Sequence, residues 1–82
     1  MKRPEALLKL REMRHLEPGW DSYGAAPIDP RAVDRAILML DSLAGGWVPV
    51  PSCDGGVQLE LHEGGFDIEI MIRAVPTKAD TP

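Results

Sequence analysis

Apolar residues recur at three- and four-residue spacing in two segments of the chain, which predicts two amphipathic helices. The first helix is expected within residues 4–17, where Pro18 ends it. The second is expected to begin after Asp29, whose carboxylate can cap free N–H groups, and to end in a left-handed conformation at Gly45-Gly46. The predicted buried stripes are Ala6, Leu7, Leu10, Met13 and Leu16 in the first helix, and Val33, Ala36, Ile37, Leu40 and Leu43 or Ala44 in the second.

After the second helix the apolar pattern changes to alternation, which predicts β-strands. The dipeptides Asp54-Gly55 and Gly64-Gly65 favour two-residue hairpin loops, so an antiparallel meander is expected. Its first strand contains two prolines, which lack the N–H that a central strand donates, and therefore belongs at an edge. The predicted strands, from the edge through the centre to the outer side, are residues 47–51, 56–62 and 66–73.

Two-residue loops would also determine the register and give an apolar sheet face. The predicted pairs are Val50 with Leu59 and Val48 with Leu61 in the first hairpin, and Leu61 with Ile68, Leu59 with Ile70 and Val57 with Ile72 in the second. The predicted fold is α+β, with two helices on one face of a three-stranded antiparallel meander (ααβββ). Residues 1–73 would form this single domain, and residues 74–82, which lack periodicity, a flexible C-terminal tail.

The opposite face of the predicted sheet is acidic. It places Glu60 directly opposite Glu69, a like-charge pair that destabilises a sheet unless a cation or a partner relieves it. Trp47 and Met71 are expected on the same side as apolar anchors. The full set of polar side chains predicted there is Gln58, Glu60, His62, Asp67 and Glu69.

The charge of the chain is unevenly distributed along its length. The 82 residues carry a net charge of −4, but residues 1–35 hold seven Lys or Arg against six Asp or Glu, whereas residues 36–82 hold two against seven. The negative charge therefore belongs to the sheet, which favours a basic partner and disfavours direct nucleic-acid binding. Arginines of the helices are interleaved with acids, which indicates a solvated surface with ion pairs.

Three uses of the acidic face are open at this point: a solvated surface, a basic-partner surface, and a metal or catalytic site. The last is disfavoured because the side chains stand on flat strands without a second histidine, so no metal, cofactor or catalytic residue is expected. The single cysteine, Cys53, excludes an internal disulfide and has no His or Lys beside it in the sequence to activate it as a nucleophile. Without a secretory signal or a long apolar stretch, a cytoplasmic protein with no membrane contact is expected.

The segment between the helices is long for such a small domain and carries two of the four aromatic residues. Trp20 is expected to close one end of the core. For Tyr23 two placements are open, one in the core and one in a partner-binding site.

With the motifs GWDSYGAAPIDPRAVDRAI, PSCDGGVQLELH and FDIEI in view, the chain resembles a group of small bacterial and phage proteins over roughly residues 7–72. Their pattern is a Gly-Trp-Asp-x-Tyr-Gly-Ala loop, a proline-capped helix and an Asp-Gly-Gly hairpin leading into an acidic strand. The resemblance implies no activity and transfers no catalytic residues. This chain departs from the pattern at Leu61, where an aromatic residue is expected after Glu60.

The leading functional hypothesis is a non-enzymatic protein inhibitor, similar to an anti-CRISPR protein in size and charge, that blocks a basic nucleic-acid-binding surface of a larger bacterial protein or ribonucleoprotein complex. Its predicted partner-binding residues are Glu60, His62, Asp67, Glu69, Trp47, Met71 and Tyr23. The alternative is an antitoxin or self-associating assembly module that binds through its helices, as a homodimer for example. An enzyme would need a cleft with a perturbed titrating pair, which the pattern does not indicate.

Overall fold

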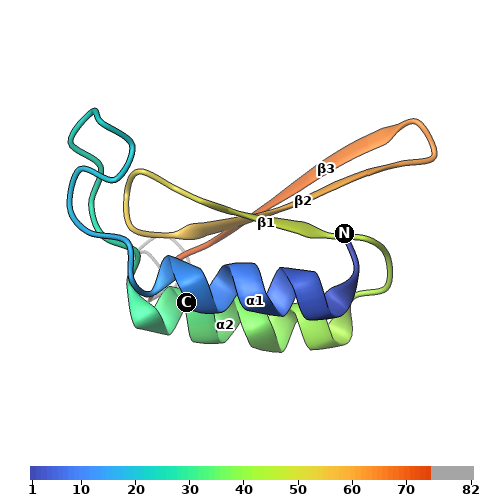
Figure 1. Cartoon of the computed structure of the whole chain (residues 1–82). Coiled ribbons are helices and arrows are strands. Elements are labelled where there is room, and N and C mark those ends of the chain that lie inside the picture. The colour runs from blue at the N-terminus through green and yellow to red at the C-terminus, as the bar shows by residue number, and fades with distance from the viewer. Residues whose placement is uncertain (75–82) are drawn as a thin grey trace, which may run out of the picture.

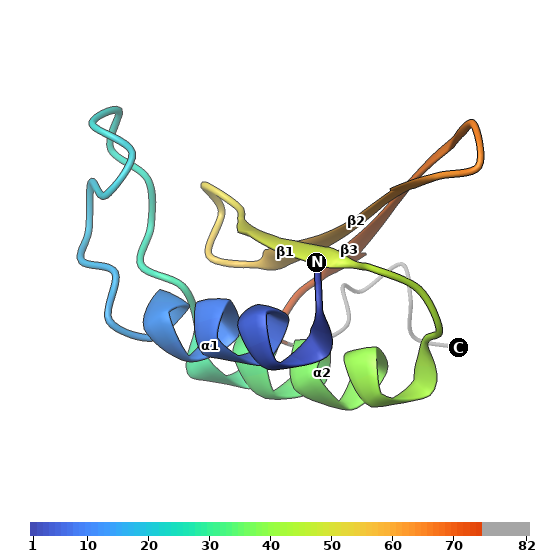
Figure 2. The same ribbon diagram turned by 45° about the vertical axis from the view of Figure 1, so that its right-hand side comes forward.

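The computed structural model describes residues 1–74 and has the predicted ααβββ fold. The helices lie side by side against one face of a three-stranded antiparallel sheet, and among the described residues no element covers the other face (Figures 1 and 2). The predicted strand order is confirmed, with β2 in the centre. The elements are α1 (Arg3–Met13), α2 (Pro30–Ser42), β1 (Val48–Pro51), β2 (Val57–Glu63) and β3 (Phe66–Ile72).

Helix α1 ends four residues earlier than the predicted boundary at residue 17. The next N–H groups, those of residues 14–16, donate to carbonyls three residues back, so the chain tightens into turns before it reaches Pro18. Leu16 nevertheless packs against the core, as do the buried residues Ala6, Leu10 and Met13. The apolar spacing therefore predicted the buried face correctly although the helix itself is shorter.

Helix α2 begins as predicted. The Asp29 side chain accepts a hydrogen bond from the Arg31 N–H at 2.9 Å, and Pro30 occupies the first helical position. The predicted left-handed end at Gly45 is wrong, because Leu43 already has extended angles (φ −104°) and the helix ends at Ser42. The extended backbone keeps Leu43 packed against the core, and the positive φ of Gly45 (112°) occurs later, in the connection to β1.

The hairpin of β2 and β3 has the predicted register. Val57 lies opposite Ile72, Leu59 opposite Ile70, and Glu60 opposite Glu69. Gly64 and Gly65 both have positive φ (60° and 80°), as a type I′ two-residue loop requires.

The predicted register of the first hairpin is wrong by one residue. Val48 lies opposite Glu60 and Val50 opposite Gln58, instead of opposite Leu61 and Leu59. The loop has three residues between Ser52 and Gly56 rather than two: the Gly55 N–H donates to the Ser52 carbonyl, and Gly55 has φ 94°. A turn closed in this way adds one residue to the connection, and a one-residue shift moves every side chain of β1 to the other face.

This shift puts the prolines of β1, instead of its valines, on the helix-covered face. Pro49 is fully buried opposite Leu59, whereas Val48 and Val50 are half-buried on the open face. Trp47 joins the core, where it is 5% exposed and its Nε1 donates to the Ala44 carbonyl at 2.9 Å. The prediction that Trp47 lies on the acidic face is therefore wrong.

The predicted C-terminal tail lies, except for Ala74, outside the described residues. Ala74 itself is half-buried and packs against the core.

Candidate functional site

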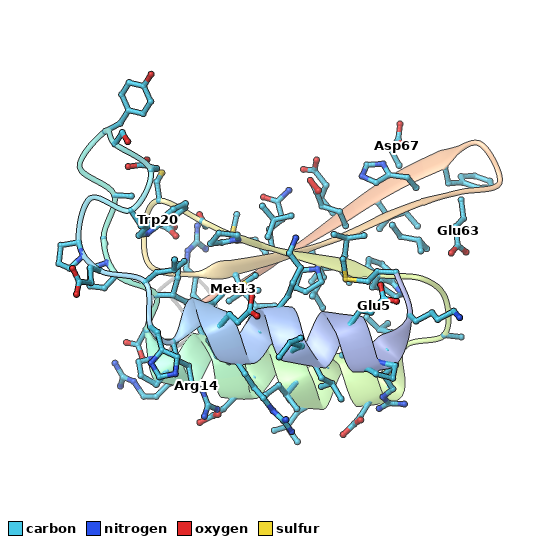
Figure 3. The ribbon with its side chains drawn as sticks, in the orientation of Figure 1. Glu5, Met13, Arg14, Trp20, Glu63 and Asp67 are labelled. Carbon is cyan, nitrogen blue, oxygen red and sulfur yellow. The ribbon has the colours of Figure 1, made fainter. Side chains whose placement is uncertain are left out.

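The candidate site is the open face of the sheet, which we call the acidic face. The alternation of the three strands brings eight side chains to it, and Figure 3 shows Asp67 pointing away from the helices while Glu63, on the other side of the hairpin, points toward them. The sheet presents these side chains without any covering element among residues 1–74. The acidic face consists of Val48, Val50, Gln58, Glu60, His62, Asp67, Glu69 and Met71.

His62 connects the acids of the two strands. Its Nδ1 lies 2.7 Å from Oδ1 of Asp67, and its Nε2 lies 3.8 Å from Oε2 of Glu60. The hydrogen bond with Asp67 is the main cause of a raised pKa of His62, to which the negative charges of Asp67 and Glu60 add. Protonated His62 therefore relieves part of the negative charge near the tip of the hairpin.

Glu60 and Glu69 form the predicted like-charge pair at the middle of the sheet. Glu60 accepts a hydrogen bond from Nε2 of Gln58 at 3.3 Å, and its side chain is 24% exposed. Glu69 is exposed and forms no ion pair with any residue in 1–74. Two carboxylates thus remain side by side on the acidic face without a cation between them, in the part of the chain described.

The structure brings together five of the seven predicted partner-binding residues and excludes two from the face. Trp47 is in the core, and Tyr23 is in the loop between the helices. The five residues that share the face are Glu60, His62, Asp67, Glu69 and Met71.

Sequence reasoning missed Val48 and Val50, which border the acids on the β1 side. A usable signal was present in the turn. Ser52 at the first position and Gly55 at the fourth position match the preferences of a type I turn, which makes the three-residue loop and the shifted register an alternative to the two-residue loop that Asp54-Gly55 favours.

The loop of residues 14–29 holds its exposed tip in a defined shape. The Asp21 carboxylate accepts the N–H groups of Tyr23 and Ala25 at 2.8 and 3.0 Å, and Trp20 Nε1 donates to the Ala26 carbonyl at 2.7 Å. Ser22 adopts a positive φ of 68° next to Tyr23. Trp20 packs against the core as predicted, whereas the Tyr23 side chain is 92% exposed.

This loop and the tip of the β2–β3 hairpin both rise away from the helices, at opposite ends of the sheet (Figures 1 and 2). Backbone bonds attach the base of the loop to the β1–β2 turn, from the Ala26 N–H to the Cys53 carbonyl and from the Asp29 N–H to the Gly55 carbonyl. An exposed tyrosine on an ordered loop is a typical anchor in protein interfaces.

The chemistry of the acidic face favours the binding of positive charge. None of its eight side chains is a hydroxyl, thiol or amine nucleophile. Residues 1–74 contain no group of three or more His, Cys, Asp or Glu side chains placed to hold a metal ion. Cys53 is exposed in the β1–β2 turn rather than on the face.

A small pocket lies on the other side of the sheet, between the start of α1 and the end of α2. It is lined by apolar core residues and by Arg3, whose guanidinium forms an ion pair with Asp41. None of the residues that line this pocket belongs to the acidic face. Its lining includes Met1, Arg3, Leu40, Leu43 and Trp47.

Across residues 1–74, neither helix has the length and apolar character needed to cross a membrane. The arginines that the sequence placed among acids do form ion pairs: Arg14 with Asp34 and Arg31 with Asp29.

Comparison with known proteins found no matching family model, curated protein or solved structure.

Proposed function

We propose that this chain is a non-enzymatic inhibitor that binds a basic, nucleic-acid-binding surface of a larger bacterial protein or ribonucleoprotein complex, in the manner of an anti-CRISPR protein. The observation that supports it best is the pair of Glu60 and Glu69, which lie opposite each other on a sheet face where residues 1–74 place no covering element and no cation between them. A Lys or Arg of a partner would convert this repulsion into attraction.

The surroundings of this pair fit a protein interface. Apolar side chains border the acids on the β1 side, where Val48 lies beside Glu60, and at one end, where Val50 and Met71 lie in the next row of the sheet. Such a border excludes water around charged contacts and strengthens them. The proposed place of action is the bacterial cytoplasm.

Tyr23 is a second proposed contact. Its loop rises at one end of the sheet and holds the ring 92% exposed, so a partner broad enough to cover the acidic face would also meet the tyrosine. Because Asp21 preorders the loop, little conformational entropy would be lost when the ring is buried.

The alternative is an antitoxin or self-associating module that binds through the helices. It is favoured by exposed apolar side chains on both helices, Leu8 on α1 (56% exposed) and Leu38 on α2 (68%). Binding of this kind would depend on apolar area and respond little to salt, whereas binding through the acidic face would weaken sharply as salt is raised.

The test is affinity capture from nuclease-treated bacterial lysate with three tagged proteins: the unchanged chain, the E60K/E69K variant and the matched control E12K/E17K. Both variants change the net charge equally, but Glu12 lies on α1 and Glu17 in the loop that follows it. We expect the unchanged chain and the control to recover the same nucleic-acid-handling complex, lost at high salt, and E60K/E69K to recover none.

The reversed pair retains two like charges opposite each other, so its stability should stay near that of the unchanged chain, which a urea titration would verify. Capture that survives the E60K/E69K change would contradict the proposed use of the acidic face. Capture that is lost with L8A/L38A and is insensitive to salt would instead support the helix-mediated alternative.

A further inference from the structure

The outer edge of β3 is an unpaired strand edge within residues 1–74. The sheet order is β1-β2-β3, so β2 uses both of its edges while β3 has a partner on one side only. The other sheet edge, β1, is four residues long and contains two prolines, features that limit pairing. The β3 edge has seven residues, no proline and a sequence rich in isoleucine, FDIEIMI.

Hairpin geometry determines which backbone groups of β3 are available. Residues that flank a two-residue loop form a hydrogen-bonded pair, here Glu63 and Phe66, and hydrogen-bonded pairs alternate along an antiparallel ladder. The N–H and C=O groups of Phe66 and every second residue after it therefore point toward β2. Those of Asp67, Glu69 and Met71 point outward.

The two sides of this edge differ in chemistry. Asp67 and Glu69 are on the acidic face. On the reverse side, Phe66 is 69% and Ile68 42% exposed, because the tip of the hairpin extends beyond the helices (Figure 1). A strand added along this edge would therefore meet carboxylates on one side and apolar side chains on the other.

We propose that β3 accepts an extended segment of the partner as a fourth, antiparallel strand, and that this segment alternates Lys or Arg with β-branched apolar residues. Its basic side chains would lie beside Asp67 and Glu69, and its apolar side chains beside Phe66 and Ile68. This inference rests on the proposed function, for which it names the chemistry of the partner segment.

A second copy of this chain fits the edge poorly. Antiparallel pairing of β3 with itself would gather Asp67 and Glu69 of both copies on one side of the joined sheet, where like charges destabilise pairing. Charge complementarity thus favours a basic strand over self-association.

The test uses the full chain, labelled with ¹⁵N, and capped eight-residue peptides that alternate Lys and Val. The peptide has four lysines, and in antiparallel pairing two of them lie opposite Asp67 and Glu69. All four then share the register of the residues whose backbone groups point outward, so the Lys N–H groups donate to β3 and the Val N–H groups point away. One peptide therefore carries N-methyl groups on its lysines, and the matched control carries them on its valines. Charge, composition and length are identical in the two.

We expect the peptide methylated on valine to bind at low salt and to shift the amide signals of residues 67–71, and the peptide methylated on lysine to bind at least tenfold more weakly. Equal binding of the two peptides, stronger binding of the peptide methylated on lysine, or no binding of either would overturn strand addition.

The E69K variant separates this inference from the proposed function. If the two peptides bind equally to the unchanged chain and both lose binding to E69K, the acidic face binds basic segments without strand addition. The proposed function would then stand and the present inference would fail. If the N-methyl difference holds but E60K/E69K still captures the host complex, strand pairing is real and the proposed function is contradicted.

Discussion

The two ends of the β2–β3 hairpin have the same alternating pattern but different surroundings. At the end near the helices, Leu59 is 0% and Ile72 3% exposed; at the tip, Ile68 is 42% and Phe66 69% exposed, although all four side chains belong to the same side of the sheet. Alternation assigns a side chain to a face but does not say whether another element covers that face.

The lengths of the elements explain the difference. Seven-residue strands extend about 23 Å, whereas the 11 residues of α1 span about 17 Å and the 13 residues of α2 about 20 Å. The helices therefore cannot cover the whole hairpin, and its tip projects beyond them (Figure 2). The covered end contributes stability, and the free end is available for binding.

The largest expected effect comes from truncating one side chain at each end. Leu59→Ala removes a fully buried side chain from the centre of the core, so the free energy of unfolding should fall by about 2–5 kcal/mol. Ile68→Ala removes a side chain that is already partly in water and should cost less than about 1 kcal/mol. Urea titrations followed by circular dichroism would measure both, and equal losses would show that the tip is covered in solution.

A smaller effect is expected where the two ends meet, at the pair of Glu60 and Glu69. Glu69→Lys replaces a cross-strand repulsion by an attraction, so the chain should become more stable by about 0.2–1 kcal/mol at low salt. Glu12→Lys, an equal change of charge on α1, is the control. A decrease in the urea midpoint for Glu69→Lys alone would mean that the pair is not repulsive in the folded chain.

The smallest expected effect is on the pKa of His62, near the tip of the β2–β3 hairpin. Asp67→Asn removes the main cause of the raised pKa of His62, so this pKa should fall toward its ordinary value of 6.5, and the remaining charge of Glu60 should keep it from falling further. An NMR titration of the imidazole protons would measure it, with Asp34→Asn on α2 as the control. An unchanged His62 titration in Asp67→Asn would contradict the hydrogen bond.

The raised pKa of His62 also predicts how the stability of the chain and its binding of a basic peptide change with pH. A pKa raised on folding means that the protonated form favours the folded chain, so this contribution is fully present below about pH 6.5 and is lost as the pH rises through the raised value. Loss of the same proton makes the acidic face more negative. A basic peptide should therefore bind more tightly above the pKa of His62 than below it.

Local chemistry determined several features of this protein from the sequence alone. Asp29 before Pro30 set the start of α2, Gly64-Gly65 set the β2–β3 register, and that register placed Glu60 opposite Glu69. These signals are local because a cap or a two-residue loop involves neighbours in the chain, so no distant contact is needed to specify them.

Tertiary structure decided the features that depend on distant contacts. Asp54-Gly55 is compatible with both a two-residue and a three-residue loop, and the choice between them decides whether β1 contributes its valines or its prolines to the core. The observed choice buries Pro49 and Trp47 under the helices and leaves Val48 beside the acids. Similarly, the sequence determined that Tyr23 lies in a loop, but its exposure follows from how the loop folds back on Asp21 and the β1–β2 turn, because burial is a property of the packed chain rather than of a residue type.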